Sequence, residues 1–247
     1  MKFLDLQQIY EVYKKKYGKD AYKHISELFV EAKSIHKVDW EKNPTKKKDH
    51  EQSWRAFKGK NMQKLIMHII KTEVEDMGLQ VIDGDGFEKT QNQNGRLDRV
   101  KRNLVIDYGE FGYHLPDVDI VIYDPKSLNV ICVISSKVTL RERIAQSAYW
   151  KMKLKNSEVT QHIRMFFVTP DEDETLKQKK PALKGRAIVE IDLDGSYVLT
   201  DNYIEESDKV KLFEHFINDL KELIENDEEI KNLLKNEFKG PLDNFID

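Results

Sequence analysis

Two short apolar runs separated by a polar turn constrain the fold of this chain more than any other feature. The runs are Ile120–Tyr123 and Val130–Ile134, and the connection between them, residues 124–129, contains proline and asparagine. Apolar segments of strand length that flank turn-forming residues are typical of a β-hairpin. We therefore predict two antiparallel strands here, with position 119 opposite 134–135.

Polar side chains gather at one end of this predicted hairpin. Asp117 and Asp119 precede the first strand, and Ser135 and Lys137 end the second. Residues two apart in an extended strand point to the same face, so each pair shares a side of the hairpin. Carboxylate oxygens are ligands that Mg²⁺ prefers, and a divalent cation can activate water against a phosphodiester. An ammonium group can stabilise the negative charge that develops at phosphorus.

Each of these residues also has an ordinary structural interpretation when it is taken alone. An aspartate before a strand often caps a loop, and a lysine at the end of a strand usually extends its charged head to water. The combination of carboxylates, strand, turn, strand and Ser-x-Lys is more specific than its parts. It favours a metal-dependent phosphodiesterase site.

The composition describes a folded, highly charged protein. Charged residues make up 34% of the 247 residues, and the mean hydropathy is −0.66. No apolar run approaches the roughly 20 residues that span a bilayer, and the first residues do not resemble a secretory signal, so we expect a cytoplasmic protein. Cys132 is the single cysteine, which excludes disulfides and cysteine-rich zinc sites.

The charges are unevenly distributed along the chain. Residues 45–64 hold seven basic and two acidic residues, and residues 137–155 hold six basic and one acidic residue. Residues 203–247 hold thirteen acidic residues against six lysines. Two basic patches and an acidic tail suit a protein that presents one face to phosphates, although solvated surfaces can show the same pattern.

Hydrophobic periodicity predicts the remaining elements. Helices are expected over 3–37 in two parts that break near Gly18, and over 61–77, 140–155, 207–226 and 228–238. Further strands are expected over 163–168, 187–191 and 197–199, the last two forming a second hairpin around an Asp-Gly turn. Residues 38–53 and 83–98 are expected to be connections. This order predicts an α/β fold with a small mixed sheet.

The pattern around the first hairpin resembles the PD-(D/E)xK nuclease superfamily, with Asp117 or Asp119 as the acidic element. Ser135 stands where that superfamily usually has an acid, two residues before Lys137. The same departure occurs in restriction endonucleases that cut around CCGG or CCNGG, and the chain is similar to the BsaWI type within that group. The resemblance covers about residues 54–200.

An arginine-rich motif follows the lysine at the spacing found in that group. Its members here are Arg141, Glu142 and Arg143, and the resemblance implies that they read the DNA sequence. Thr139 and Glu142 also form a predicted capping box that starts a helix. Arginine can bind guanine and a carboxylate can accept from cytosine. Capping by the glutamate and phosphate contacts by the arginines remain the alternatives.

One acid of the family pattern is missing. The related enzymes place a glutamate about 13 residues after the lysine, where this chain has Trp150. Gln146 is the nearest polar substitute, and Glu73 is a second candidate because it falls on the apolar face of helix 61–77. His114 lies near the acidic element, but no partner residue supports a proton-shuttle role.

The resemblance implies a Mg²⁺-dependent type II restriction endonuclease with a restriction-endonuclease-like core, a mixed β-sheet flanked by helices. Residues 1–55 would form an N-terminal helical accessory region and residues 56–247 the nuclease core. Asp119 and Asp117 would hold the metal, Lys137 would activate water, and Ser135 would support the site. Cutting both strands of a palindrome calls for a homodimer. A structure-selective repair or recombination nuclease and an inactive DNA-binding protein remain alternatives.

Overall fold

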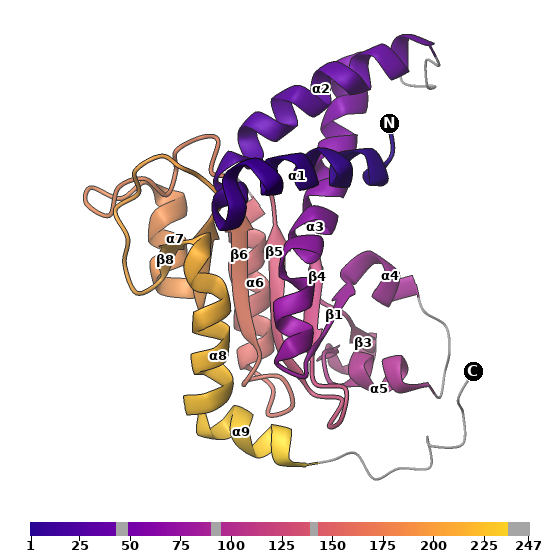
Figure 1. The fold of residues 1–247 in the computed structure, drawn as a ribbon. Helices are drawn as coiled ribbons and strands as arrows, with labels where there is room; N and C mark the ends of the chain where they lie inside the picture. The colour runs from indigo at the N-terminus through magenta and orange to yellow at the C-terminus, as the bar shows by residue number, and fades with distance from the viewer. Residues whose placement is uncertain (43–48, 90–94, 139–142, 237–247) are drawn as a thin grey trace.

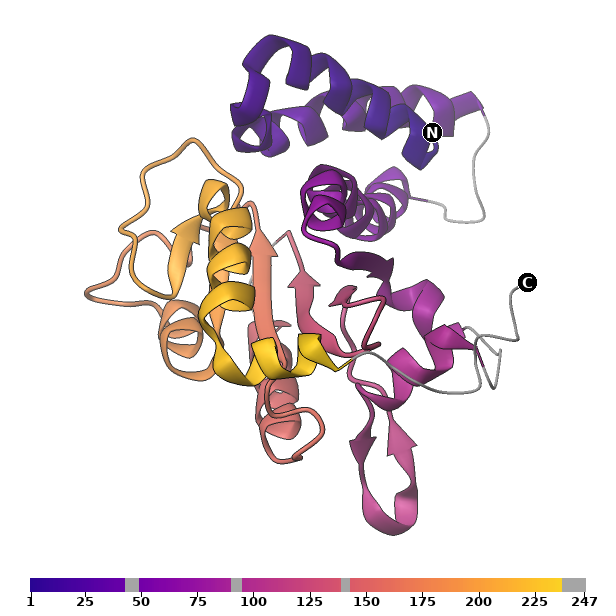
Figure 2. The same cartoon turned by 60° about the horizontal axis from the view of Figure 1, so that its bottom comes forward.

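A six-stranded mixed sheet forms the centre of the computed structural model, which describes residues 1–42, 49–89, 95–138 and 143–236 (Figure 1). The sheet has the order β1-β4-β5-β6-β7-β8; β4 is antiparallel to β1 and β5, and β5 to β8 are parallel. The strands are β1 (Gln80–Asp83), β4 (Ile120–Tyr123), β5 (Val130–Ser136), β6 (Arg164–Thr169), β7 (Gly195–Val198) and β8 (Val210–Leu212). A separate two-stranded hairpin, seen projecting in Figure 2, consists of β2 (Ile106–Asp107) and β3 (Tyr113–His114).

Helices cover both faces of the sheet. α3 and α8 lie on one face with α1 and α2 beyond the strand ends, and α6 and α7 lie on the other (Figure 1). The helices are α1 (Phe3–Tyr17), α2 (Ile25–Lys42), α3 (His50–Asp76), α4 (Gly84–Lys89), α5 (Arg96–Arg102), α6 (Arg143–Lys155), α7 (Lys184–Asp192), α8 (Phe216–Asn226) and α9 (Glu228–Lys235). No helix within the described ranges combines the length and apolar character that a bilayer crossing needs.

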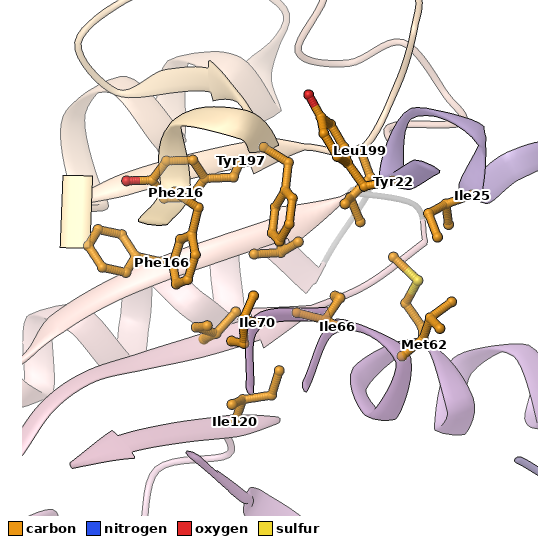
Figure 3. Close-up of a cluster of buried hydrophobic side chains, with 14 of the residues drawn as sticks. Tyr22, Ile25, Met62, Ile66, Ile70, Ile120, Phe166, Tyr197, Leu199 and Phe216 are labelled. Carbon is orange, nitrogen blue, oxygen red and sulfur yellow. The ribbon is translucent and has the colours of Figure 1, made fainter. Parts of the chain in front are cut away.

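Alternate residues of the central strands enter two hydrophobic cores. Ile120 and Ile134 face the core shared with α3 and α8, whereas Val121 and Val133 face the core under α6 and α7. Figure 3 shows part of the first core, where Ile66 and Ile70 of α3 lie with strand and α8 residues. Burying one such side chain stabilises the fold by about 1.5–3 kcal/mol. The two cores fix the sheet between its helical layers.

The N-terminal helices pack into the first of these cores. Ile25, Leu28 and Phe29 are fully buried and belong to the same cluster as the α3 and strand residues. The break between α1 and α2 is a short 3-10 segment, Gly18–His24, as the glycine suggested. Residue 55, the predicted boundary of the accessory region, falls inside α3.

The β4–β5 hairpin has the predicted pairing. Ile120 pairs with Ile134, and the backbone N–H of Asp119 donates to the Ile134 carbonyl at 3.0 Å. Position 119 is therefore opposite 134–135, as predicted. β5 continues two residues further than expected, to Ser136, because β6 pairs with it in parallel along that extension.

The predicted connections 38–53 and 83–98 are wrong where tertiary packing extends or creates helices, and their residues 43–48 and 90–94 lie outside the described residues. α2 continues to Lys42 and α3 begins at His50, where Trp54 and Phe57 pack against the ring of His36 from α2. Residues 84–89 form α4, which the glycines and aspartates of this segment did not suggest.

The predicted second hairpin is also wrong. Residues 187–191 lie in α7, and β7 pairs in parallel with β6 and β8. Arg186 and Val189 are fully buried one helical turn apart, so this short apolar run follows a helical period. The predicted helix over 207–226 begins as an α-helix only at Phe216, since residues 207–215 contain β8 and a short 3-10 helix, Phe213–His215.

Candidate active site

Asp119 and Lys137 meet at one edge of the sheet, where β4 begins and β5 ends, and we call this place the catalytic edge after the roles predicted for the two residues. Nζ of Lys137 lies 2.8 Å from Oδ1 and 2.7 Å from Oδ2 of Asp119. The backbone N–H of Ser136 donates to the same Oδ2 at 2.6 Å. The aspartate is buried with 9% of its surface exposed, so these donors fix its carboxylate in one orientation.

The electrostatics of Asp119 suit a divalent cation. Burial raises the pKa of its carboxyl above the ordinary value, and the nearby Asp117 raises it further, although Lys137 and the Ser136 N–H act in the opposite direction. The positive charge of Lys137 does not fully offset the cost of burying the negative carboxylate, so a further cation would stabilise the ionised form. Mg²⁺ prefers oxygen ligands of this kind. The donor set therefore fits a hard metal ion.

Asp117 and Ser135 lie next to this pair in different environments. Asp117 is exposed, and its Oδ2 accepts from Nε2 of Gln146 in α6 at 2.7 Å. Ser135 is buried in β5, one residue beyond the Ile134 that pairs with Ile120. The fold thus places all four predicted catalytic residues at the same end of the hairpin.

The predicted recognition residues are only partly within the described structure. Arg141 and Glu142, together with Thr139, lie outside the described residues. Arg143 is the first residue of α6, six positions after Lys137. The last residue of the motif is therefore the first residue of that helix.

The two candidates for the missing acid, Gln146 and Glu73, lie in different parts of the fold. Gln146 contacts Asp117 as described above, whereas Glu73 is exposed on α3 beside α1, where it contributes to raising the pKa of Tyr10. Trp150 packs against the core under α6. His114 belongs to the projecting hairpin, with Nε2 3.1 Å from the Phe111 carbonyl. Of these residues, the contacts place Gln146 at the catalytic edge.

A cleft of about 860 Å³ opens beside Lys137 and runs along α3. Its walls include Ser136 and Lys137 from the catalytic edge and Glu172 from the loop after β6. Four further basic residues from α2 and α3 line it: Lys33, Arg55, Lys58 and Lys60. Two of them are paired with acids of the same cleft, Lys58 with Glu172 at 2.6 Å and Lys33 with Glu51 at 2.8 Å. Basic residues that lead along a cleft to the Asp119–Lys137 pair suit the backbone phosphates of DNA.

The junction between β1 and α4 also reaches the catalytic edge, which the sequence analysis missed. The backbone N–H of Gly84 donates to the Asp119 carbonyl at 2.9 Å, and Asp85 lines the cleft beside Lys137. An Asp-Gly-Asp sequence directly after an apolar segment was the available signal. This sequence predicts a loop, because glycine and aspartate are common in turns.

Gly84→Ala is expected to destabilise the protein because there is no room for a side chain. A Cβ at this position would meet the Val118 carbonyl oxygen at 2.0 Å. Overpacking of this kind costs about 1–3 kcal/mol. Chemical denaturation measures the loss, and Gly86→Ala is the control because its Cβ would meet only Asp83 at 4.0 Å. Equal stability of the two variants would contradict the tight approach.

Comparison with known proteins identifies the family of this chain. Residues 96–219 match the family of BsaWI restriction endonuclease type 2. MjaVIP of Methanocaldococcus jannaschii, described as a type II restriction enzyme, is 39% identical over 177 residues, which cover 70% of this chain and 77% of that protein. HpyAORF263P of Helicobacter pylori, also described as a type II restriction enzyme, is 32% identical over 128 residues, which cover 52% of this chain and 65% of that protein.

A solved structure shares the fold. The restriction endonuclease PspGI, in a complex with substrate DNA, superposes with a TM-score of 0.51 at 15% identity, over 89% of this chain and 93% of that chain. This likeness shows the restriction-endonuclease fold that the sequence predicted. Together with the family match, it confirms the predicted kinship: the chain belongs to the BsaWI family of type II restriction endonucleases, which are site-specific deoxyribonucleases.

Proposed function

We propose that this endonuclease uses Mg²⁺ to cut double-stranded DNA at a site with a CCGG or CCNGG core, and that it acts as a homodimer. The observation that carries the catalytic part is the contact of Asp119 with both Lys137 and the Ser136 N–H at the sheet edge. A buried carboxylate that shares its environment with an ammonium group provides a metal ligand and a charge stabiliser side by side.

The residues have distinct roles in this proposal. Asp119 and Asp117 would hold the cation, which when bound would polarise the phosphate and lower the pKa of the attacking water. Lys137 orients that water and stabilises the negative charge that develops on the phosphate oxygens. The Ser136 N–H keeps the Asp119 carboxylate turned toward the lysine. Ser135 supports the site from β5.

Sequence choice is assigned to the arginine motif. In the sequence, Arg141, Glu142 and Arg143 follow Lys137, and Arg143 is the first residue of α6. A helix N-terminus can enter the major groove, where arginine binds guanine O6 and N7 and a carboxylate accepts from cytosine N4. The closeness of this motif to Lys137 in the chain supports a base-reading role beside the scissile phosphate.

The N-terminal region is assigned an accessory role in DNA binding. Residues 1–55 contribute Lys33 and Arg55 to the lining of the cleft, and the proposed nuclease core, residues 56–247, contributes Lys137. Cations in this lining can hold backbone phosphates and so fix the position of the duplex. Two copies related by a two-fold axis would present both catalytic edges to a palindromic site.

Digestion of a plasmid of known sequence with Mg²⁺ tests the proposed site. Sequencing of the ends is expected to show one shared sequence with a CCGG or CCNGG core. Ends that share a different core would overturn the assignment of the site while leaving the endonuclease activity in place.

Asp119→Asn is expected to remove Mg²⁺-dependent cleavage, and Asp117→Asn to reduce it less. An amide cannot replace an anionic oxygen ligand of Mg²⁺, and the loss of metal stabilisation costs several kcal/mol. Asp117 is exposed and already accepts from Gln146, so its substitution perturbs the site less. Single-turnover rates of both variants make the comparison. A dead Asp117 variant beside an active Asp119 variant would reverse the order of the two ligands.

A further inference from the structure

The proposed metal site is short of one carboxylate. Trp150 occupies the position of the acid expected from the resemblance, and it is partly buried against the core under α6. Gln146 reaches Asp117 from the same helix but carries no charge. The segment that leads into β4 therefore provides two carboxylates, those of Asp117 and Asp119. Helix α6 adds no acidic residue to them.

Asp85 approaches the same place from another element. It is an exposed residue in the first turn of α4, and it lines two cavities that flank the acidic segment. The smaller cavity, of about 150 Å³, is shared with Pro116, Asp117 and Val118. The larger is the cleft that contains Lys137. Asp85 thus lines one cavity together with Asp117 and the other together with Lys137.

The backbone around Asp85 is held firmly against the catalytic segment. Gly84 donates to the Asp119 carbonyl, and its contact with Val118 leaves no space for a side chain. Oδ1 of Asp83 accepts from Nε2 of the buried Gln63 at 2.9 Å and from the Asp85 N–H at 3.2 Å. The Asp83 carboxylate therefore stabilises the turn through these hydrogen bonds. Asp85, in contrast, lines both cavities.

An unsatisfied hydroxyl points to a ligand in the same cleft. Ser136 lines the cleft with Asp85, and only 2% of its surface is exposed. Its Oγ is buried and has no hydrogen-bond partner within the described residues. A buried hydroxyl without a partner costs about 1–3 kcal/mol. Water that is bound in the cleft would remove that cost.

We infer that Asp85 is a third carboxylate of the metal site and binds the water shell of the divalent cation rather than the cation itself. The oxygens of Asp85, Asp117 and Asp119 do not form a group within 4.8 Å of one another among the described residues, which argues against a closed cage. Mg²⁺ is usually held by one or two carboxylates and keeps several waters. The inference rests on the proposed function, since it completes the site that Asp119 begins.

Direct binding of Mn²⁺ to the full-length protein without DNA tests this role separately from cleavage. Free Mn²⁺ is measured by electron paramagnetic resonance during titration of wild type, Asp85→Asn, Asp85→Glu and Glu88→Gln. Loss of a group that binds a metal ligand weakens metal affinity by about 10–100-fold, which is the expected effect of Asp85→Asn. Asp85→Glu is expected to restore part of the affinity. Glu88 lines the smaller cavity in the same helix, so its variant controls for general loss of charge.

The outcomes separate this inference from the proposed function, with Asp119→Asn as the reference. Weak Mn²⁺ binding by both the Asp119 and Asp85 variants, with normal binding by the Glu88 variant, supports the role of Asp85. Wild-type affinity in Asp85→Asn, or an equal loss in Glu88→Gln, overturns it while Asp119 stands. If wild type binds no Mn²⁺, or if Asp119→Asn binds it normally, both the proposed metal site at Asp119 and the role of Asp85 are contradicted. Thermal unfolding verifies that the exposed substitutions leave the fold intact.

Discussion

Lys137→Ala is expected to abolish cleavage while binding to DNA survives. Nζ of Lys137 lies within 2.8 Å of both Asp119 oxygens, and its proposed role is to stabilise the negative charge that develops on the phosphate. Removal of one such donor lowers the rate by about 100–1000-fold because it acts mainly on the transition state. Single-turnover cleavage with Mg²⁺ and a metal-free binding titration measure the two effects separately.

Lys126→Ala is a suitable control for this substitution. Lys126 lies in the turn between β4 and β5, at the opposite end of the same hairpin, and carries the same charge. Its variant is expected to cleave like wild type. Circular dichroism verifies that Lys137→Ala keeps its secondary structure, since it leaves a buried carboxylate without its ammonium partner. Cleavage by Lys137→Ala at a rate near wild type would contradict the catalytic assignment.

The catalytic hairpin was predictable because its structure is determined locally. The lengths of the two apolar runs and the residues between them set the pairing, and the pairing places Asp119 and Lys137 at one end. Alternation along the strands then decides which face each side chain takes. The kinship was visible in the same short segment, which lies within the 96–219 match.

The parallel half of the sheet was not predictable from local pattern. The run 187–191 is short enough to suit a strand or a helix, and only the burial of Arg186 and Val189 together shows the helical choice. β7 lies between β6 and β8 because of pairings distant in sequence. Propensity carries no information about such partners.

Asp85 illustrates the same limit within the candidate site. Its segment was polar and rich in glycine, which predicted a connection. What brings it to the catalytic edge is the pairing of β1 with β4 and the close approach of Gly84 to Val118. Contacts between elements that are more than 30 residues apart decided its position, and a single sequence does not show them.

Arg141→Ala and Arg143→Ala are expected to weaken binding to cognate DNA far more than binding to random DNA. Each lost bidentate contact to guanine costs about 1–3 kcal/mol, and a dimer on a palindrome loses it in both half-sites. Random duplexes offer no matched guanines, so the loss there should be much smaller. Titrations with a duplex that contains the CCGG core and with a scrambled duplex measure the difference.

Arg55→Ala is the matched control for the arginine variants. Arg55 is exposed in the cleft wall and is assigned to the DNA backbone. Its variant should weaken binding to both duplexes alike and reduce the slope of log affinity against log salt by about one unit. Lys151 does not suit this purpose, because its ammonium is buried and bound to Asp194 at 2.6 Å.

Comparison of the DNA affinities of the Arg141 and Arg143 variants with that of Arg55→Ala shows whether the arginine motif reads bases. If Arg141→Ala and Arg143→Ala lower affinity only for the cognate duplex, they read bases, and the helix that begins at Arg143 lies in the major groove beside the catalytic edge. If they lower affinity equally for both duplexes, as Arg55→Ala should, they contact phosphates only. The CCGG assignment would then fall with the base contacts, because no other residue in the proposal reads guanine.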